Sequence, residues 1–178
     1  MIPPAETWTS IQAVREIHDR QVRRWMPHIT LVYPFRPRAE FDGVSEALSA
    51  ACVDVAPFQI KLAEFRSFEH KGGGCTVWLS PEPIEDMVKL QTSLWEAVPD
   101  CDEVRKYSGG FTPHLSVGQA TGREKSQKLI AALQDPWEPL TFRAEEVSLI
   151  WRDDTSDDRF RVAKHISLGT GKIEDEVP

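Results

Sequence analysis

The sequence has few of the features that mark secreted or membrane-spanning chains. Its three cysteines, Cys52, Cys75 and Cys101, are odd in number and widely spaced, which gives neither a disulfide framework nor a zinc-ligand pattern. No run of about 18 apolar residues could span a bilayer. The opening MIPPAETWTS has no basic start and no apolar stretch, so we expect no secretory signal. We therefore expect a cytoplasmic protein, with the nucleus as the alternative.

Positive charge is also scarce, with 21 Lys and Arg against 28 Asp and Glu and a net charge of −7. Binding to many phosphates requires clustered positive charge, because counterion release drives it. We therefore expect no extended nucleic-acid binding, whereas a small anion or one RNA end remains open. The exception is the segment from Arg20 to Arg38, which has five arginines and no acidic residue and contains His28. Its simplest interpretation is a solvated cationic surface.

The length of 178 residues and the pattern of apolar residues predict one domain over residues 1–178 with an α+β fold. Helical periodicity covers four segments, 10–22, 40–55, 84–98 and 122–133. Extended or alternating patterns cover six segments, 28–35, 58–70, 75–81, 109–120, 140–154 and 160–169. The triple glycine 72–74 predicts a hairpin turn, and residues 171–178 are expected to form a flexible tail.

Two related motifs stand out, PHITLV at residues 27–32 and PHLSVG at residues 113–118. Each has a proline, a histidine, an aliphatic residue, a hydroxyl residue and a second aliphatic residue. With 13 prolines and five histidines in the chain, chance gives roughly 0.4 Pro-His pairs, and two occur. Because strand side chains alternate, His28 shares a face with Thr30, and His114 shares a face with Ser116.

Two histidines and two hydroxyls suit in-line opening of a phosphodiester. The reaction needs a base on the attacking oxygen and an acid on the leaving oxygen, and the histidine pKa near neutrality fits both roles. Hydroxyls can donate to the non-bridging oxygens, where negative charge gathers in the transition state. This chemistry requires no metal, and no cluster of His, Cys, Asp and Glu in the sequence has metal-ligand spacing.

The paired motifs, separated by 86 residues from His28 to His114, resemble those of the two-histidine (2H) phosphoesterase superfamily, which includes 2′-5′ RNA ligase-like proteins and cyclic phosphodiesterases. The resemblance implies two pseudo-symmetric lobes whose antiparallel sheets form a concave groove, with helices outside. It implies His28 and His114 as catalytic residues, with His28 as the acid and His114 as the base. Thr30 and Ser116 would bind the substrate phosphate.

By the same resemblance, the substrate is a nucleotide or an RNA end that carries a 2′,3′-cyclic phosphate. We expect a monomer that uses no cofactor and no metal and binds no membrane. Two alternatives remain open: 2′-5′ end joining by the same residues in reverse, and a module that binds nucleotide or RNA without turnover. The retention of two titratable histidines counts against the module, because binding alone does not require them.

Several further residues are weaker candidates. A phosphate clamp could come from any of four cations, Arg36, Arg105, Lys106 and Arg123. Gln119 could bind substrate or cap its strand. Tyr33 and Phe35 are expected in the core, with Tyr33 able to reach the mouth of the groove. A third His-x-Ser, His165 with Ser167, lacks the preceding proline and is expected at most to line the groove. His18 and His70 are expected at the surface.

Overall fold

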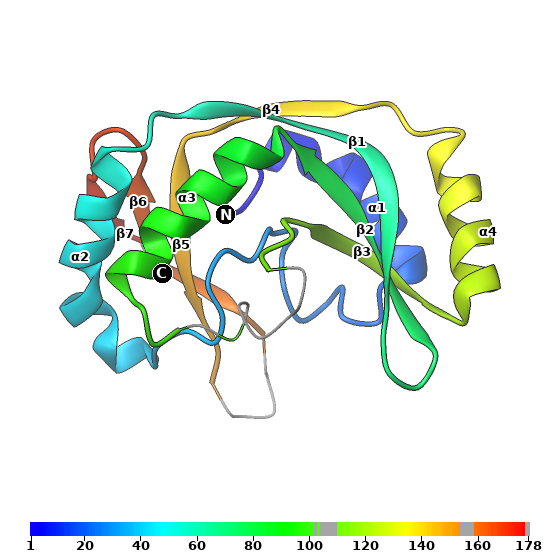
Figure 1. Ribbon diagram of the computed structural model, residues 1–178, viewed down its shortest axis with the longest axis horizontal. Helices are drawn as coiled ribbons and strands as arrows, with labels where there is room; N and C mark the ends of the chain where they lie inside the picture. Colours follow the sequence, from blue (N-terminus) through cyan, green and yellow to red (C-terminus); the bar gives the residue numbers. More distant parts are fainter. Residues whose placement is uncertain (102, 104–109, 154–158, 177–178) are drawn as a thin grey trace.

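The computed structural model describes residues 1–101, 103, 110–153 and 159–176. Two antiparallel sheets and four helices account for most of this part of the chain (Figure 1). The first sheet has the order β3-β2-β1-β4. Its strands are β1 (Phe58–Glu69), β2 (Gly74–Glu82), β3 (Leu115–Thr121) and β4 (Leu140–Ala144). The second sheet, in the order β5-β6-β7, contains β5 (Glu146–Trp151), β6 (Arg161–Ser167) and β7 (Ile173–Asp175).

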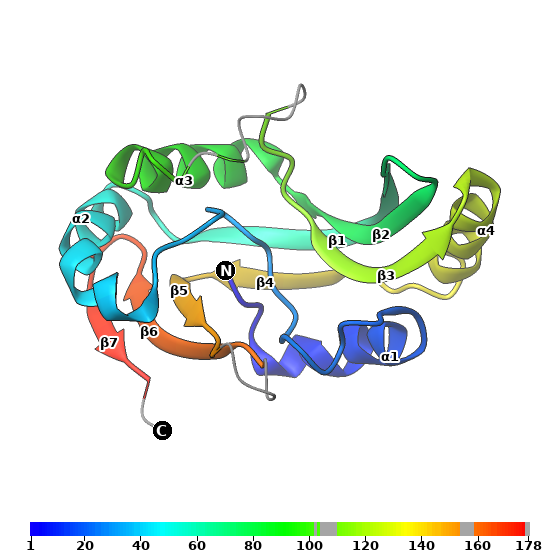
Figure 2. The ribbon, with the colours of Figure 1, turned by 90° about the horizontal axis from the view of Figure 1, so that it is seen from below.

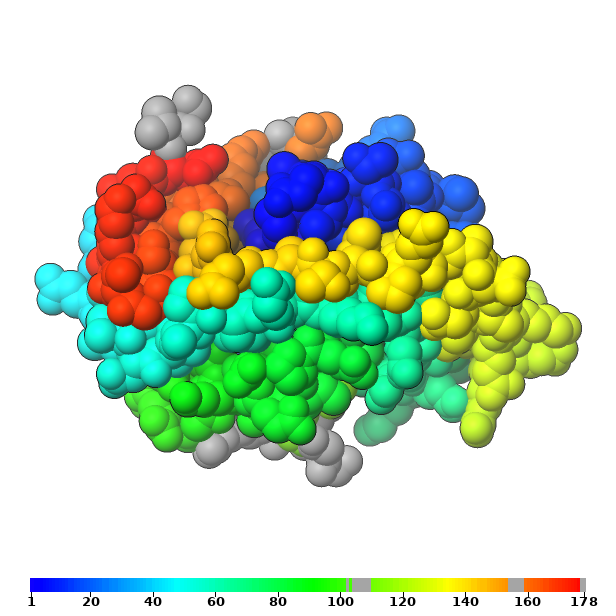
Figure 3. All heavy atoms as spheres, turned by 90° about the horizontal axis from the view of Figure 1, so that it is seen from above, coloured from blue at the N-terminus to red at the C-terminus, as the bar shows by residue number. Residues whose placement is uncertain are grey.

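The helices lie outside the two sheets. They are α1 (Trp8–His18), α2 (Phe41–Val53), α3 (Ile84–Ala97) and α4 (Arg123–Gln134). Helices α2 and α3 lie at the end of the molecule that holds the second sheet, and α1 and α4 flank the curved first sheet (Figures 1 and 2). The long strand β1 and the segment containing β4 join the two ends. In Figure 3 this segment crosses the surface between β1 and the N-terminal helix.

One continuous apolar core connects the part of the molecule that holds the first sheet with the part that holds the second sheet. Side chains with no exposed area come from both sheets and from the helices, including Ile60, Leu79, Leu90, Leu115 and Ile166. The three cysteines are buried thiols. Among the residues that the structure describes, no helix has the length and apolar character needed to cross a bilayer. The observed architecture confirms the predicted α+β class with antiparallel sheets and outer helices.

The hairpin between β1 and β2 follows the predicted turn. Gly72 and Gly73 have φ angles of 99° and 81°, a region that residues with a Cβ rarely adopt. The turn is closed by the His70 N–H, which donates to the Gly74 carbonyl at 2.8 Å. Register then pairs Phe68 with Thr76 and brings the glycine-rich end of the hairpin beside β3.

Several sequence-based boundaries were wrong. The stretch 140–154 is two strands in different sheets, since β4 ends at Ala144 and β5 begins at Glu146. The strand predicted over 109–120 begins at Leu115, because Pro113 has no N–H to donate to a ladder. The expected tail at 171–178 contains β7, which pairs with β6. Ser49 also donates a hydrogen bond to the Gly171 carbonyl at 2.6 Å, so this segment is held against α2.

The first helix also turns a different face inward than expected. The helical periodicity over 10–22 predicts that Ile11, Val14 and Ile17 face the core, but the Ile17 side chain is 77% exposed. Arg15 is buried instead, with 1% of its area exposed, together with Asp19 just beyond the helix. An ion pair between these two residues satisfies their charges, which allows a polar stripe to face inward.

Candidate active site

The first motif lies along the edge of the first sheet, beside β3. Ile29 forms an isolated antiparallel bridge with Leu115, and both side chains are fully buried. In an antiparallel pair, the residues on either side of a bridge also lie opposite each other and share the other face. The register of this bridge therefore aligns His28 with Ser116 and Thr30 with His114. In this register each histidine is aligned with the hydroxyl residue of the other motif.

Each of the two histidines is held by a hydrogen bond of the same kind, from Nδ1 to a backbone carbonyl two residues earlier. Nδ1 of His28 lies 2.8 Å from the carbonyl oxygen of Met26, and Nδ1 of His114 lies 2.8 Å from the carbonyl oxygen of Thr112. A carbonyl oxygen only accepts, so Nδ1 carries the proton in both rings. When the rings are neutral, the lone pair is then on Nε2. Both Nε2 atoms are therefore the positions at which the two rings can exchange a proton with a ligand.

The site lowers the basicity of both rings. Burial lowers the pKa of His28 to about 4, and the charges of the Met1 amine, Arg15 and His114 lower it further, whereas the hydrogen bond that the ring donates to the Met26 carbonyl raises it. Burial also lowers the pKa of His114 below its usual value. Both imidazoles are therefore neutral in the unliganded protein at pH 7. The charge of His114 is among the causes that lower the pKa of His28, so the two rings lie within one electrostatic environment.

Aromatic rings surround His114 on the first sheet. Phe68 meets the imidazole edge-on with the ring centres 4.9 Å apart, and Trp78 does so at 5.9 Å. These two rings stack on each other at 4.8 Å. Register places Trp78 directly opposite Ser116, so the aromatic pair belongs to the same face of the sheet as the motif. Sequence reasoning missed both residues, and burial along β2 gives no alternation that marks Trp78, because Val77, Trp78 and Leu79 are all buried.

His28 has an aromatic pair of its own. Trp25 meets its ring edge-on with the ring centres 5.1 Å apart, and the ring of Phe160 lies 5.5 Å from that of Trp25. The backbone joins the same segments, because the Phe160 N–H donates to the Arg24 carbonyl at 2.8 Å. Trp25 stands only three residues before His28, but no periodicity in the sequence linked it to Phe160. Each imidazole thus contacts at least one aromatic side chain, which restricts rotation of the imidazole ring.

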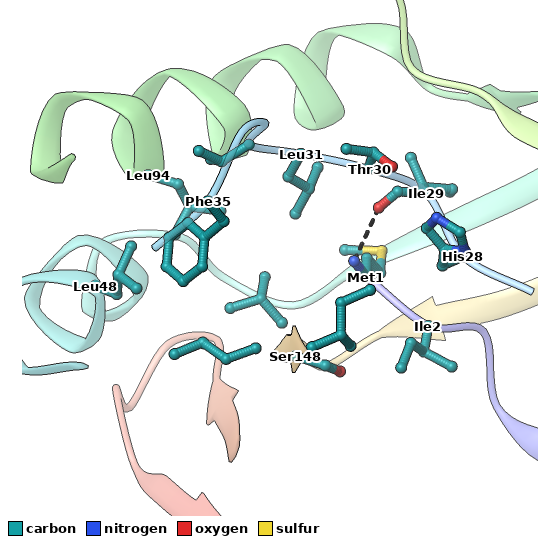
Figure 4. Close-up of a pocket in the computed structure, with 14 residues that line it drawn as sticks. Met1, Ile2, His28, Ile29, Thr30, Leu31, Phe35, Leu48, Leu94 and Ser148 are labelled. Atoms are coloured by element: carbon teal, nitrogen blue, oxygen red, sulfur yellow. Dashed lines mark hydrogen bonds between the residues drawn. The ribbon is translucent and has the colours of Figure 1, made fainter. Parts of the chain in front are cut away.

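A small apolar cavity of about 100 Å³ lies behind the first motif (Figure 4). It lies between residues 28–35, β5 and α3, and His28 and Thr30 are at its edge. Most of its lining is aliphatic, and Ser148 is one of its few polar residues. The N-terminal amine of Met1 donates to the Ile29 carbonyl at 2.9 Å beside it. An aliphatic lining does not stabilise an anion, so the face that carries the two histidines is the better place for a phosphate.

The weaker candidates lie outside the paired motifs. Arg36 binds Asp100 at 2.5 Å and Glu40 at 3.5 Å, so its guanidinium is already committed to carboxylates. Arg123 lies 3.5 Å from Glu69 at the surface. Arg105 and Lys106 fall outside the described residues. The structure therefore gives no support to a phosphate clamp at Arg36 or Arg123.

The remaining aromatic residues and histidines also have structural positions. Tyr33 is 60% exposed rather than in the core, whereas Phe35 is partly buried against the core. His70 is exposed as expected and bonds Thr76 at 2.8 Å. The expected surface position of His18 is wrong, because it is half-buried where α1 approaches Gly118.

The third His-x-Ser motif does not join the other two. The ring of His165 lies between two carboxylates, with Nδ1 2.6 Å from Glu146 and Nε2 3.0 Å from Glu176. Both ring nitrogens are therefore occupied. Gln119 likewise binds the chain, at Asp19 and at the backbone of Arg20. Among the described residues, no group of three His, Cys, Asp or Glu side chains could hold a metal ion.

The two-sheet α+β fold with paired His-x-Thr and His-x-Ser motifs defines the class of two-histidine phosphoesterases. A family model described as the 2′-5′ RNA ligase superfamily matches residues 3–156. The chain belongs to this superfamily.

Individual relatives agree with that assignment. A Geobacillus kaustophilus protein named as a putative phosphoesterase is 25% identical over 120 residues, which span 67% of this chain and 66% of that protein. The crystal structure of TT0787 from Thermus thermophilus has a TM-score of 0.63 at 18% identity, with 93% of each chain covered. E. coli LigT complexed with 3′-AMP has a TM-score of 0.56 at 18% identity, with 93% of this chain and 92% of LigT covered. The two solved structures show a shared fold.

Proposed function

We propose that this protein is a metal-independent phosphodiesterase that opens 2′,3′-cyclic phosphates of nucleotides or RNA ends. The observation that carries the proposal is the local two-fold arrangement of the motifs about the Ile29–Leu115 bridge, with each Nδ1 tied to a carbonyl. This arrangement leaves two Nε2 atoms and two hydroxyls on one face. LigT binds a ribonucleotide, 3′-AMP, on the same fold, which supports a nucleotide as the ligand.

The reaction adds water across one phosphorus–oxygen bond. Nε2 of His114 takes a proton from the attacking water as the new P–O bond forms. Nε2 of His28 donates a proton to the ribose oxygen as the ring P–O bond breaks. Thr30 and Ser116 donate hydrogen bonds to the non-bridging oxygens as charge develops there. One bond forms and one breaks, and the exchanged protons balance.

The low pKa of His28 bears on these roles. A neutral His114 is ready to act as a base, but His28 must be protonated to act as an acid, and its pKa of about 4 disfavours that form in the unliganded protein. A bound phosphate diester places a negative charge beside both rings and raises their pKa values. Protonation of His28 is therefore coupled to substrate binding.

A substrate with a good leaving group tests these roles. A nitrophenyl phosphodiester needs little protonation of the leaving oxygen, whereas a cyclic nucleotide needs it. We expect His28→Ala to recover most of its lost rate on the nitrophenyl ester and His114→Ala to remain slow on both substrates. The reverse pattern would exchange the roles of the two histidines. Wild-type rates in both variants would exclude a two-histidine mechanism.

A further inference from the structure

Arg15 makes more contacts than an ordinary ion pair in a helix. Its guanidinium donates to Asp19 Oδ2 from Nε at 3.0 Å, to the Gln12 side chain from Nη1 at 2.9 Å, and to the Trp25 carbonyl from Nη2 at 2.9 Å. The side chain is 1% exposed. A charge in such a position must be fully paired, and only the planar fork of arginine reaches three partners in one plane. One of the three is backbone, close to His28.

Asp19 and Gln119 extend this network to the second motif. Asp19 Oδ1 accepts from the backbone N–H of Gln21 at 2.9 Å and from Nε2 of Gln119 at 3.0 Å. The other atom of the Gln119 amide, Oε1, accepts from the Arg20 N–H at 2.9 Å. Gln119 lies on β3, three residues beyond Ser116. The amide of one strand residue thus holds the start of the segment 19–26 against the strand that carries Ser116.

The segment 19–26 supports the first histidine directly. The Met26 carbonyl accepts from Nδ1 of His28, and the Trp25 ring meets the imidazole edge-on at 5.1 Å. Arg15 binds the carbonyl of Trp25, which is the residue next to Met26. A shift of this segment would move both the hydrogen bond and the ring contact that orient the imidazole.

We propose that Arg15, Asp19 and Gln119 are positioning residues of the active site. They fix the segment 19–26 between α1 and β3, and through the Met26 carbonyl they hold the His28 ring with Nε2 toward the substrate phosphate. The network also couples the two motifs, because the same amide that holds this segment belongs to β3, the strand that carries Ser116 and directly follows His114. The catalytic consequence rests on the proposed function, whereas the effect on ring orientation does not.

The primary test measures the ring itself, without substrate. Long-range ¹H–¹⁵N spectra of the His28 imidazole at pH 7 report which nitrogen carries the proton. We expect the Nδ1–H tautomer alone in the wild type. Gln119→Met keeps the length of the side chain but loses both hydrogen bonds, and Arg15→Lys keeps the charge but loses the fork. Both variants should show a second tautomer or exchange broadening at His28.

A matched control is the exposed pair Lys128–Glu124, which has the same four-residue spacing on α4. Lys128→Met should leave the spectrum of His28 unchanged. The proposal is overturned if folded Gln119→Met has the wild-type spectrum at His28, even where its Tm is lower, since the network would then be purely structural. Because Gln119 is only half-buried, this variant keeps the test valid if Arg15→Lys fails to fold.

Kinetics then test the catalytic consequence. On a 2′,3′-cyclic nucleotide, Gln119→Met should lower kcat roughly 10-fold and Arg15→Lys roughly 100-fold, with KM changed by less than about threefold, as expected for misplacement of a reacting group. On a nitrophenyl phosphodiester both losses should shrink, as for His28→Ala. Equal losses on both substrates would contradict an action through His28. A His28→Ala variant as active as the wild type would instead refute the proposed function. The conclusion about ring orientation, which rests on the spectra of Gln119→Met and Arg15→Lys, would not change.

Discussion

Acidification should destabilise this protein through His28. The folded protein holds this ring at a pKa of about 4, mainly because of burial, whereas an unfolded chain has a pKa near 6.5. Between these two values the unfolded chain binds a proton at this position and the folded protein does not. The free energy of unfolding must therefore fall as the pH falls from about 6.5 to about 4.

The magnitude follows from the difference between the two pKa values. Each pH unit between the two pKa values lowers the free energy of unfolding by about 1.4 kcal/mol. Lowering the pH from 7 to 5 should therefore lower the free energy of unfolding by about 2 kcal/mol through His28 alone. His114 shifts in the same direction and adds to the loss. Urea unfolding at pH 7 and pH 5 measures this difference, and a loss of 2 kcal/mol corresponds to a midpoint lower by about 1 M.

His28→Asn isolates this contribution. The Asn amide can still donate to the Met26 carbonyl but does not titrate, so the loss between pH 7 and pH 5 should shrink by about 2 kcal/mol. Thr30→Val is the control, since it alters the same face without removing a titrating group and should keep the wild-type pH dependence. If the wild type and His28→Asn lose equal stability between the two pH values, the ring is not held neutral by the fold.

Three further predictions concern the hydroxyls, a glycine and metal ions. Thr30→Ala and Ser116→Ala should each lower the single-turnover rate by a factor on the order of 10² to 10³ with the fold intact, and wild-type rates in both would remove the hydroxyls from the mechanism. Gly118→Ala should lower the free energy of unfolding by about 1 to 3 kcal/mol, because the Cβ of the new alanine would lie 2.7 Å from Cβ of His18. Gly74→Ala, which has open space, should cost less, and equal urea midpoints for the two variants would refute this reasoning. Turnover should persist in EDTA, and a loss restored by a divalent ion would contradict metal independence.

Strand alternation was enough to predict which motif residues share a face. The buried Ile29 and Leu115 and the half-buried His28, Thr30 and Ser116 follow the expected period of two. The prolines were informative in a way that the prediction did not use. Pro113 precedes His114 just before β3 begins, and Pro27 precedes His28 beside the isolated Ile29–Leu115 bridge, so neither histidine lies inside a ladder.

The surroundings of the histidines could not be predicted, because they depend on pairing between distant segments. Trp25, Phe68, Trp78 and Phe160 come from four parts of the chain, and alternation does not say which strands become neighbours. The break between β4 and β5 at Glu145 could not be predicted for the same reason, because one continuous stretch of alternating residues forms strands in two different sheets. Arg15 was also out of reach, because its burial depends on Asp19 and on a backbone carbonyl ten residues away.

Turnover of 2′,3′-cyclic nucleotides is the most direct test of the central claim. A panel of the four nucleotides should be offered to the wild type, His28→Ala and His114→Ala, with the linear phosphate product quantified. We predict hydrolysis by the wild type and a loss of roughly 10² to 10⁴ in rate for each variant, as expected when a general acid or base is removed. Wild-type protein that binds these nucleotides without hydrolysing them, or variants as fast as the wild type, would contradict the two-histidine mechanism.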